Sequence, residues 1–317
     1  MSLPPVASIT VDLDSAYQYR HIHGLPQVGR GDDTPLTLGV ERLLDLFAAH
    51  AIPATLFVVG ADSQRPAHRA LLERAHARGH ELANHTFHHR YDLRSRPRAE
   101  RAADITAGEL LISEITGSSP LGFRTPGYNI DEALLADLSE RGYLYDSSVL
   151  PAPPYWLAKA AVMSWRSVTG SPSGSSTTPA RNLLSPLEAY RADPSALWRE
   201  DPAGSAMWQV PMCVIPGARV PVIGTSLHLL GAKGFDAAMP ALARAYPRLL
   251  QIAFHAIDFV DSTDPGLEDL VARQPDLAVP WETKRSLYDR VFQAIRRRYR
   301  FSTLADAVRS LGPPRRA

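Results

Sequence analysis

Four side chains in the first third of the chain have the types that hold a metal ion beside a free base. Asp12 and Asp14 flank a single leucine at the end of an apolar run, and His85 and His89 follow about seventy residues later. Two imidazoles and one carboxylate provide three protein ligands and leave an open position, as catalytic zinc sites do. The second carboxylate then remains as a general base. The pattern predicts a metal-dependent hydrolase, provided that the fold brings these residues together.

The spacing within each pair favours a shared site. Asp12 and Asp14 are two residues apart, so their side chains leave the same face if the strand continues through them. His85 and His89 are four residues apart, which on one helical turn brings their Cβ atoms within about 5 to 6 Å. His88 is the competing second ligand. Zn²⁺ is the favoured metal, and Co²⁺, Ni²⁺ or Fe²⁺ would suit the same donors.

Strands and helices alternate along most of the chain. Residues 6–11 form a β-branched apolar run that predicts a buried parallel strand, followed by a polar loop to about Pro35. Further strands are predicted at 54–59, 81–84, 121–123, 143–145 and 249–254, with a last one starting at Phe301. Helices are predicted at 40–47, 66–78, 98–116, 131–141 and 283–298. This alternation predicts an α/β fold in which a parallel sheet forms a distorted (β/α) barrel.

Polar residues follow five of these strands. They are Asp12, His85, Arg124, Asp146 and His255. An acidic residue in such a place is usually a helix cap or a turn residue when it stands alone. Because the carboxyl ends of barrel strands gather at one rim, we expect the five side chains to meet in one pocket.

The alternation stops between residues 151 and 230. Residues 167–179 are rich in Ser, Thr, Gly and Pro and predict a mobile loop, whereas 207–230 is apolar but carries several prolines. We expect an irregular excursion over one barrel mouth, with at most one strand near residues 208–212. The more specific alternative is that this excursion is a substrate lid or a lipid-facing patch. The whole chain, 1–317, is predicted to be a single domain with 151–230 as an insertion.

Charge and cysteine content exclude several classes. The chain has 34 Lys and Arg against 33 Asp and Glu, a net charge of +1, so nucleic acid is not an expected partner. Cys213 is the single cysteine and is expected to be a buried thiol.

Because neither a signal peptide nor an apolar run of about eighteen residues is visible, we expect a cytoplasmic protein. The basic run 296–298 favours a solvated helix end, with peripheral contact at the inner membrane face as the alternative. The oligomeric state is not indicated.

Four motifs, in this order, resemble those of polysaccharide deacetylases of the NodB-homology group, carbohydrate esterase family 4, whose fold is a distorted β/α barrel. Residues 10–14, Thr-Val-Asp-Leu-Asp, stand where the family has two adjacent aspartates. Residues 85–89, His-Thr-Phe-His-His, match the family's second motif, in which a histidine is followed by a serine or threonine, two variable residues and a second histidine. Residues 123–128 resemble its Arg-x-Pro motif, and Phe254-His255 lies where the family keeps an acid histidine.

The resemblance implies a role for each of these residues. The metal ligands would be Asp14, His85 and His89. Asp12 would be the general base, and Arg124 would orient it through a charge-assisted hydrogen bond. His255 would be the general acid.

Weaker assignments complete the implied site. The backbone N–H of Gly127 would stabilise an oxyanion, and Tyr128 beside it would contact substrate. Asp146 would support the acid or contact substrate. Asp258 would tune His255, or else be an ordinary turn residue.

The Asp-x-Asp spacing resembles a branch that acts on small or lipid-linked substrates and includes the deformylase of aminoarabinose on a polyprenyl phosphate. The resemblance implies a hydrolase of non-peptide C–N bonds that removes an acetyl or formyl group from an amino sugar or lipid-linked amino sugar. An amidase acting on a small nonsugar amide or a cyclic imide is the second hypothesis. A noncatalytic binding module on the same fold is the third.

Overall fold

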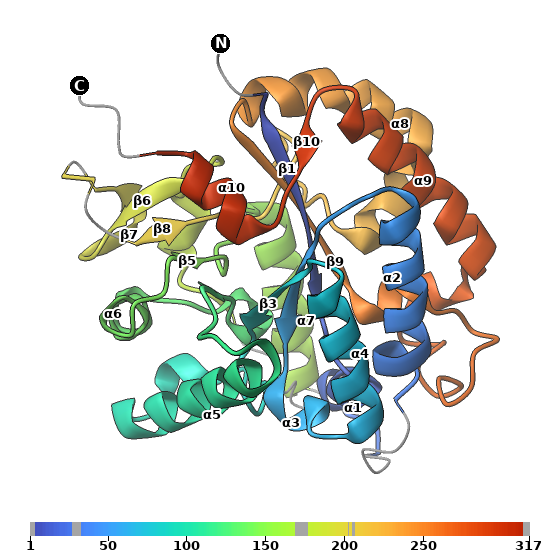
Figure 1. The fold of residues 1–317 in the computed structure, drawn as a ribbon, viewed down its shortest axis with the longest axis horizontal. Helices are drawn as coiled ribbons and strands as arrows, with labels where there is room; N and C mark the ends of the chain where they lie inside the picture. The colour runs from blue at the N-terminus through green and yellow to red at the C-terminus, as the bar shows by residue number, and fades with distance from the viewer. Residues whose placement is uncertain (1–3, 27–32, 169–176, 202, 205–206, 313–317) are drawn as a thin grey trace.

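A curled sheet with helices packed outside it forms the centre of this computed structural model, which describes residues 4–26, 33–168, 177–201, 203–204 and 207–312 (Figure 1). The strands in the described chain are β1 (Val6–Asp12), β2 (Thr55–Val58), β3 (Glu81–Asn84), β4 (Gly122–Phe123), β5 (Tyr145–Asp146), β6 (Tyr190–Asp193), β7 (Ala196–Glu200), β8 (Trp208–Gln209), β9 (Leu249–His255) and β10 (Arg300–Phe301). The helices are α1 (Ala16–His23), α2 (Val40–Ala49), α3 (Gly60–Ser63), α4 (Pro66–Ala77), α5 (Arg98–Thr116), α6 (Glu132–Glu140), α7 (Pro153–Val168), α8 (Gly224–Ala245), α9 (Trp281–Arg296) and α10 (Leu304–Ser310).

Strand β1 is the central strand of the sheet. It pairs in parallel with β9 along its whole length, which sets Asp12 opposite His255. Its other edge pairs with β10 at the start and with β2 toward the end. The order then continues through β3, β4, β5 and β8, with β6 antiparallel to β8 and to β7. The sheet is therefore mixed and curls into a half-barrel, which confirms the predicted α/β class and adds an antiparallel hairpin that the prediction lacked.

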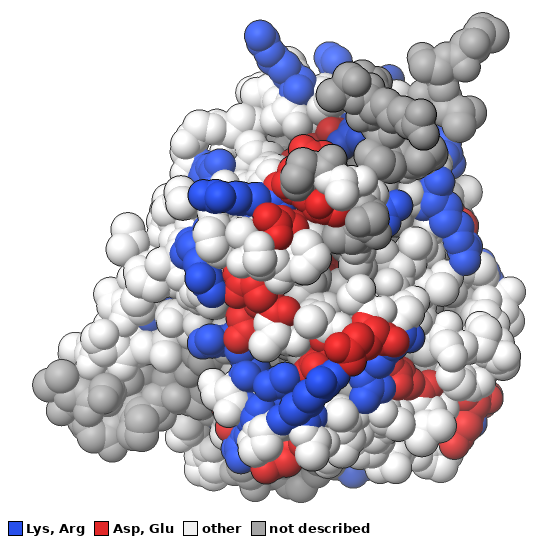
Figure 2. Space-filling view, turned by 90° about the vertical axis from the view of Figure 1, so that its left-hand side faces the viewer, with Lys and Arg blue, Asp and Glu red and all other residues white. Residues whose placement is uncertain are grey.

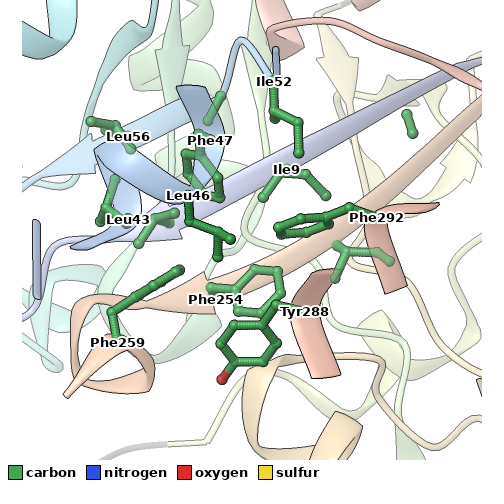
Figure 3. Close-up of a cluster of buried hydrophobic side chains, with 14 of the residues drawn as sticks. Ile9, Leu43, Leu46, Phe47, Ile52, Leu56, Phe254, Phe259, Tyr288 and Phe292 are labelled. Atoms are coloured by element: carbon green, nitrogen blue, oxygen red, sulfur yellow. The ribbon is translucent and has the colours of Figure 1, made fainter. Parts of the chain in front are cut away.

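An apolar core holds β1 and β9 in place behind the site. All seven residues of β1 are buried, as expected for a β-branched strand covered on both faces. Figure 3 shows Ile9 of β1, Phe47 of α2, Phe254 of β9 and Phe292 of α9 packed together. The ring of Phe292 lies 5.9 Å from that of Phe47 and 6.1 Å from that of Phe254. Rigid packing of the two strands fixes the polar residues at their ends.

The polar segment after Asp14 contains a helix where a loop was expected. Helix α1 follows β1 after three residues, and the backbone N–H of Ala16 donates to the carboxylate of Asp33 at 2.9 Å. Helix N-termini are normally capped by the residue just before them. Here Ser15 stands at the N-cap position but makes no side-chain capping hydrogen bond, and the acceptor comes from seventeen residues away.

The excursion at 151–230 is more regular than expected. It contains α7, the β6–β7 hairpin, β8 and the start of α8, whereas at most one strand was predicted. The predicted strand at 208–212 is shortened to β8. In α7 Leu157 and Trp165 remain 62% and 67% exposed, so the helix has no simple buried stripe that a periodicity search would detect. Of the predicted loop at 167–179, residues 169–176 lie outside the described chain.

Surface charge is mixed on the one face of the molecule that Figure 2 shows. On the face seen in Figure 2, Lys and Arg lie beside Asp and Glu instead of forming a separate basic field. In the described residues no helix is both long and apolar enough to cross a membrane. Cys213 is buried, as predicted, and burial raises the pKa of its thiol.

Candidate metal centre and catalytic cavity

Asp14, His85 and His89 meet at the rim where β1 and β3 end. Candidate ligand atoms of the three residues lie within 4.8 Å of one another. Nε2 of His89 is 3.0 Å from Oδ1 of Asp14, and Nε2 of His85 is 3.5 Å from the same oxygen. The three predicted ligands therefore form one buried cluster.

The two histidines meet through a tight turn and not through the predicted helical turn. Thr86 and His89 both have positive φ, 67° and 56°. The turn is held because Thr86 N–H donates to Oδ1 of Asn84 at 2.9 Å, while His89 N–H donates to Oγ1 of Thr86 at 3.0 Å. Positive φ costs free energy for a side-chain-bearing residue and is retained where the surroundings enforce it.

His88, the competing ligand, is turned away from this cluster. Its imidazole is 57% exposed and pairs with Asp104 at 2.5 Å. An i+3 position would face the same side as His85 only on a helix. Because the segment is a turn, the alternative ligand is wrong.

The polar atoms of the cluster suit a divalent metal. Oδ1 of Asp14 and both ring nitrogens of His89 are buried and make no hydrogen bond of ordinary geometry among the described residues, although Oδ1 and Nε2 lie only 3.0 Å apart. Nδ1 of His85 lies 2.7 Å from the carbonyl oxygen of Arg124, so Nδ1–H is the donor and Nε2 presents its lone pair to the cluster. Buried polar atoms without partners are costly. A cation bound by these three residues would satisfy them.

Ionisation in the cluster also favours a cation. Burial alone would raise the pKa of Asp14, yet the adjacent His89 and His85 hold that pKa well below its usual range. Burial alone would lower the pKa of His85, but Asp12 and Asp14 outweigh burial and raise it. The two carboxylates therefore attract positive charge to this place, either from a proton on the imidazole or from a metal that displaces it.

Asp12 is held by a buried arginine. Arg124 donates through Nη1 to Oδ1 of Asp12, and both side chains are essentially inaccessible to solvent. Its Nε donates to the carbonyl of Ser147 at 2.9 Å, and its Nη2 donates to Oγ of Ser147 at 2.9 Å and Oγ1 of Thr10 at 3.2 Å. The guanidinium also lies 3.9 Å above the ring of Phe57. One oxygen of Asp12 is thus engaged, and Oδ2 is the oxygen that lies toward His255.

His255 stands next to Asp12 across the β1–β9 pair. Its Nε2 is 3.7 Å from Oδ2 of Asp12 and 3.1 Å from the hydroxyl of Tyr128. Asp258 accepts a hydrogen bond from the backbone N–H of His255 at 2.8 Å, and burial raises the pKa of Asp258 to about 6. Asp258 is therefore a capping residue of the turn after β9 that also borders the cavity.

These residues open into a cavity of about 560 Å³. Its walls include part of α7 and the start of α8. Helix α7 lies within the excursion at 151–230, and α8 begins near its end. The predicted site residues that line it are Asp12, Asp14, His85, Gly127, Tyr128, His255 and Asp258.

Asp146 is not among the lining residues. It is fully buried, accepts hydrogen bonds from N–H and Oγ–H of Ser148 and from Nε2 of Gln209, and burial raises its pKa to about 6. Ser148 in turn accepts from the backbone N–H of Thr125 at 2.8 Å. Asp146 therefore supports the segment that follows Arg124, and the structure does not bring it to the cavity.

Two functional candidates were missed in the sequence. Ser147 accepts hydrogen bonds from Arg124 through its carbonyl oxygen and its hydroxyl oxygen. The only feature of the sequence that could have indicated this role is its position directly after a predicted strand and Asp146. Lys159 of α7 lines the cavity. It lies in the excursion, where no regular element was predicted.

Comparison with known proteins finds a family match for part of the chain. The model of the polysaccharide deacetylase family matches residues 32–145. A chitooligosaccharide deacetylase of Sinorhizobium fredii is 38% identical over 81 residues, which are 23% of this chain and 36% of that protein. A peptidoglycan-N-acetylglucosamine deacetylase of Bacillus cereus is 32% identical over 112 residues, 35% of this chain and 51% of that protein. The chain thus spans between about a third and a half of the relatives that it matches.

Solved structures extend the likeness to the whole fold. A probable polysaccharide deacetylase from Pseudomonas aeruginosa PAO1 has a TM-score of 0.60 at 15% identity and covers 96% of this chain and 90% of its own. PuuE allantoinase has a TM-score of 0.58 at 16% identity, covering 96% and 89%. The half-barrel is therefore of the NodB type, and within it residues 32–145 match the model of the polysaccharide deacetylase family.

Proposed function

We propose that the protein is a metal-dependent hydrolase that removes an N-acyl group from an amino sugar. The observation that carries the proposal is the buried Asp14, His85 and His89 cluster beside the Asp12–Arg124 pair and His255. The names of the matched relatives, which are deacetylases of chitooligosaccharide and of peptidoglycan N-acetylglucosamine, support the substrate class.

Asp14, His85 and His89 would hold the metal, with Zn²⁺ as the expected ion. When bound, a divalent ion at this place supplies Lewis acidity, which polarises an amide carbonyl and makes water more acidic. The hydrogen bond from Nδ1–H of His85 to the Arg124 carbonyl fixes the tautomer that this requires.

Asp12 would take the proton of the attacking water. Its Oδ1 is occupied by Arg124, so Oδ2 is the oxygen that is free to accept the proton. The guanidinium keeps the carboxylate oriented, and an immobile base has less entropy to lose on the way to the transition state. His255, whose Nε2 lies 3.7 Å from Oδ2, is placed to protonate the leaving amine.

The turn at Gly127 would stabilise the developing oxyanion. Gly127 borders the cavity with φ of 65°, and the next N–H, of Tyr128, is already donated to the carbonyl of Thr125 at 3.2 Å. We therefore assign the oxyanion donor to the backbone N–H of Gly127. The Tyr128 hydroxyl, 3.1 Å from Nε2 of His255, would orient the acid.

A cavity of about 560 Å³ with α7 as one of its walls favours a compact substrate over a long polymer. An acetyl or formyl group on a single amino sugar, free or lipid-linked, would fit this expectation. Rapid hydrolysis of polymeric chitin would contradict it.

The proposal is tested by mass spectrometry of the products of metal-reconstituted protein with a panel of N-acetyl and N-formyl amino sugars, free and lipid-linked. A free amine and acetate or formate are expected from at least one member. A panel of nonsugar amides and cyclic imides provides the comparison, and turnover confined to that second panel would reject the sugar assignment.

A further inference from the structure

Lys159 of α7 lines the catalytic cavity beside the Gly127 turn. It lines the cavity together with the metal-site residues Asp14 and His85. Its Nζ lies 3.6 Å from the point that a Cβ on Gly127 would occupy, and the ring of Tyr91 lies 2.7 Å from that point. Tyr91 in turn packs edge-on against His89, with 5.0 Å between ring centroids. The Tyr91 ring and the Gly127 turn thus connect this ammonium group to the metal site.

The charge of Lys159 is not balanced by any residue in the described part of the chain. Among the residues that the structure describes, none forms a hydrogen bond or an ion pair with its ammonium group. Burial lowers the pKa of Lys159 to about 8. A cation that is partly withdrawn from water and lacks a counter-charge is destabilising unless a ligand supplies one.

The carboxylates of the cavity are all engaged elsewhere. Asp12 is bound by Arg124, Asp14 faces the two histidines, and Asp258 accepts the N–H of His255. Lys159 is also the only Lys or Arg among the described residues that line the cavity. The cavity thus has an acidic floor at the metal site and, within the described chain, a single unpaired cation near the Gly127 turn.

We propose that Lys159 is a specificity-determining residue that binds an anionic group, a phosphate or a carboxylate, carried by the amino-sugar substrate. This inference rests on the proposed function and narrows its substrate class to acidic acylated amino sugars. An anion next to Lys159 would form a charge-assisted hydrogen bond in a partly desolvated place, where such bonds are stronger than in water.

The wall around Lys159 suits the rest of such a substrate. Tyr155, Val162 and Met163 of the same helix and Leu229 of α8 line this side of the cavity. A bound substrate would cover their exposed apolar surface, and the water excluded on binding would strengthen its ion pair with Lys159. Because these neighbours are uncharged, Lys159 is the group on this wall that can select for a negatively charged substrate.

The test compares three substrates that differ in charge: N-acetylglucosamine, its 6-phosphate, and N-acetylmuramic acid, which carries a carboxylate. The variants are Lys159→Met, which removes the charge at similar length, and Lys159→Arg, which retains it. Lys233→Met is the matched control, because Lys233 is an exposed lysine of α8 that does not line the cavity.

Lys159→Met is expected to lower kcat/KM for the preferred acidic substrate about 10- to 100-fold, chiefly through KM, and to change the neutral sugar less than about threefold. Lys159→Arg should recover most of the loss, and Lys233→Met should resemble the wild type. Preference for the phosphate or for the carboxylate identifies the anion. An equal loss on all three substrates, or no loss, would overturn the inference.

Direct binding separates this inference from the proposed function. Isothermal titration of the wild type and Lys159→Met with the two acidic sugars reports on Lys159 even if no sugar is deacylated. Binding that weakens at least about tenfold in the variant supports the inference. If neither acidic sugar binds the wild type more tightly than N-acetylglucosamine, Lys159 has no such role.

Discussion

The carbonyl oxygen of Arg124 accepts a hydrogen bond of 2.7 Å from Nδ1 of His85. The side chain of the same arginine donates to Asp12. Arg124 therefore sets the orientation of a metal-ligand candidate with its backbone and that of the base candidate with its guanidinium. The metal half and the base half of the site are connected through one residue.

This arrangement predicts that replacing Arg124 affects stability and activity more than metal binding. Arg124→Met leaves the Asp12 carboxylate buried without its cation, and breaking such a pair costs about 3 to 5 kcal/mol. We expect that loss in the free energy of unfolding, measured by denaturant titration. Bound metal at saturating concentration should persist, because the bond to His85 uses the backbone.

Arg124→Lys provides the matched comparison. It keeps the charge but loses the planar fork that reaches Asp12, Ser147 and Thr10 together. Partial recovery of stability with poor activity is expected. Wild-type stability in Arg124→Met would show that the buried pair does not have the assigned importance.

Metal content should depend on His89 and not on His88. His89→Ala removes a buried nitrogen of the cluster, and we expect bound Zn²⁺, measured by elemental mass spectrometry, to fall well below one per chain. The rise in melting temperature on adding Zn²⁺ should also vanish, because that rise reflects binding to the folded state. His88→Ala serves as control and should retain both. Equal metal loss in the two variants would be incompatible with the site.

Asp12→Asn should separate catalysis from metal binding. The amide retains the shape of the side chain but cannot take a proton, so kcat is expected to fall about 10²- to 10⁴-fold. Elemental mass spectrometry of the same sample should still find metal. A metal-loaded Asp12→Asn protein with full activity would remove Asp12 from the role of base.

Gly127→Ala is expected to be more damaging than an ordinary change at a left-handed glycine. Gly127 has φ of 65°, and a Cβ there would lie 2.7 Å from the Tyr91 ring. Gly142→Ala is the control, with φ of 81° and no neighbour of the added Cβ within 4 Å. Gly142→Ala should lower the free energy of unfolding by about 1 kcal/mol, and Gly127→Ala by about 2 to 4 kcal/mol. Equal losses would mean that Tyr91 moves aside freely.

The raised pKa of Asp146 predicts that the free energy of unfolding depends on pH. Its pKa is raised from 3.8 to about 6, so between these values the folded state binds the proton more tightly than the unfolded state. The stability that it contributes is fully present below about pH 4 and is lost as pH rises through about 6, a change of about 1 to 3 kcal/mol.

Asp146→Asn should abolish that dependence. The amide is neutral throughout, and Oε1 of Gln209, buried without a partner in the described structure, can accept its N–H after an amide rotation. The difference in unfolding free energy between variant and wild type, measured from about pH 4 to 8, should grow in favour of the variant as pH rises. A constant difference would contradict the raised pKa.

The positions of side chains at the ends of long strands could be predicted from the sequence. Asp12 and His255 were expected at one rim, because β1 and β9 are continuous apolar runs and parallel strands end on the same side. The ligand set followed from residue types and from the family resemblance. A continuous apolar run sufficed to predict each of these two strands.

Features that depend on distant contacts were not predictable in the same way. The Asp33 cap of α1, the turn that replaces a helix at 85–89, and the hydrogen bonds that keep Asp146 from the cavity all involve residues far apart or a strained backbone. Helix α7 was missed because its exposed apolar residues obscure any single buried face. Lys159 was missed with it.

The most direct test of the central claim is a titration of metal-free protein with Zn²⁺ while the release of acetate from an N-acetyl amino sugar is recorded. The account predicts that the deacylation rate rises to saturation at one equivalent of metal per chain and stays at background in His89→Ala. Acetate release that is independent of added metal, or stoichiometric metal binding without deacylation of any sugar in the panel, would contradict it.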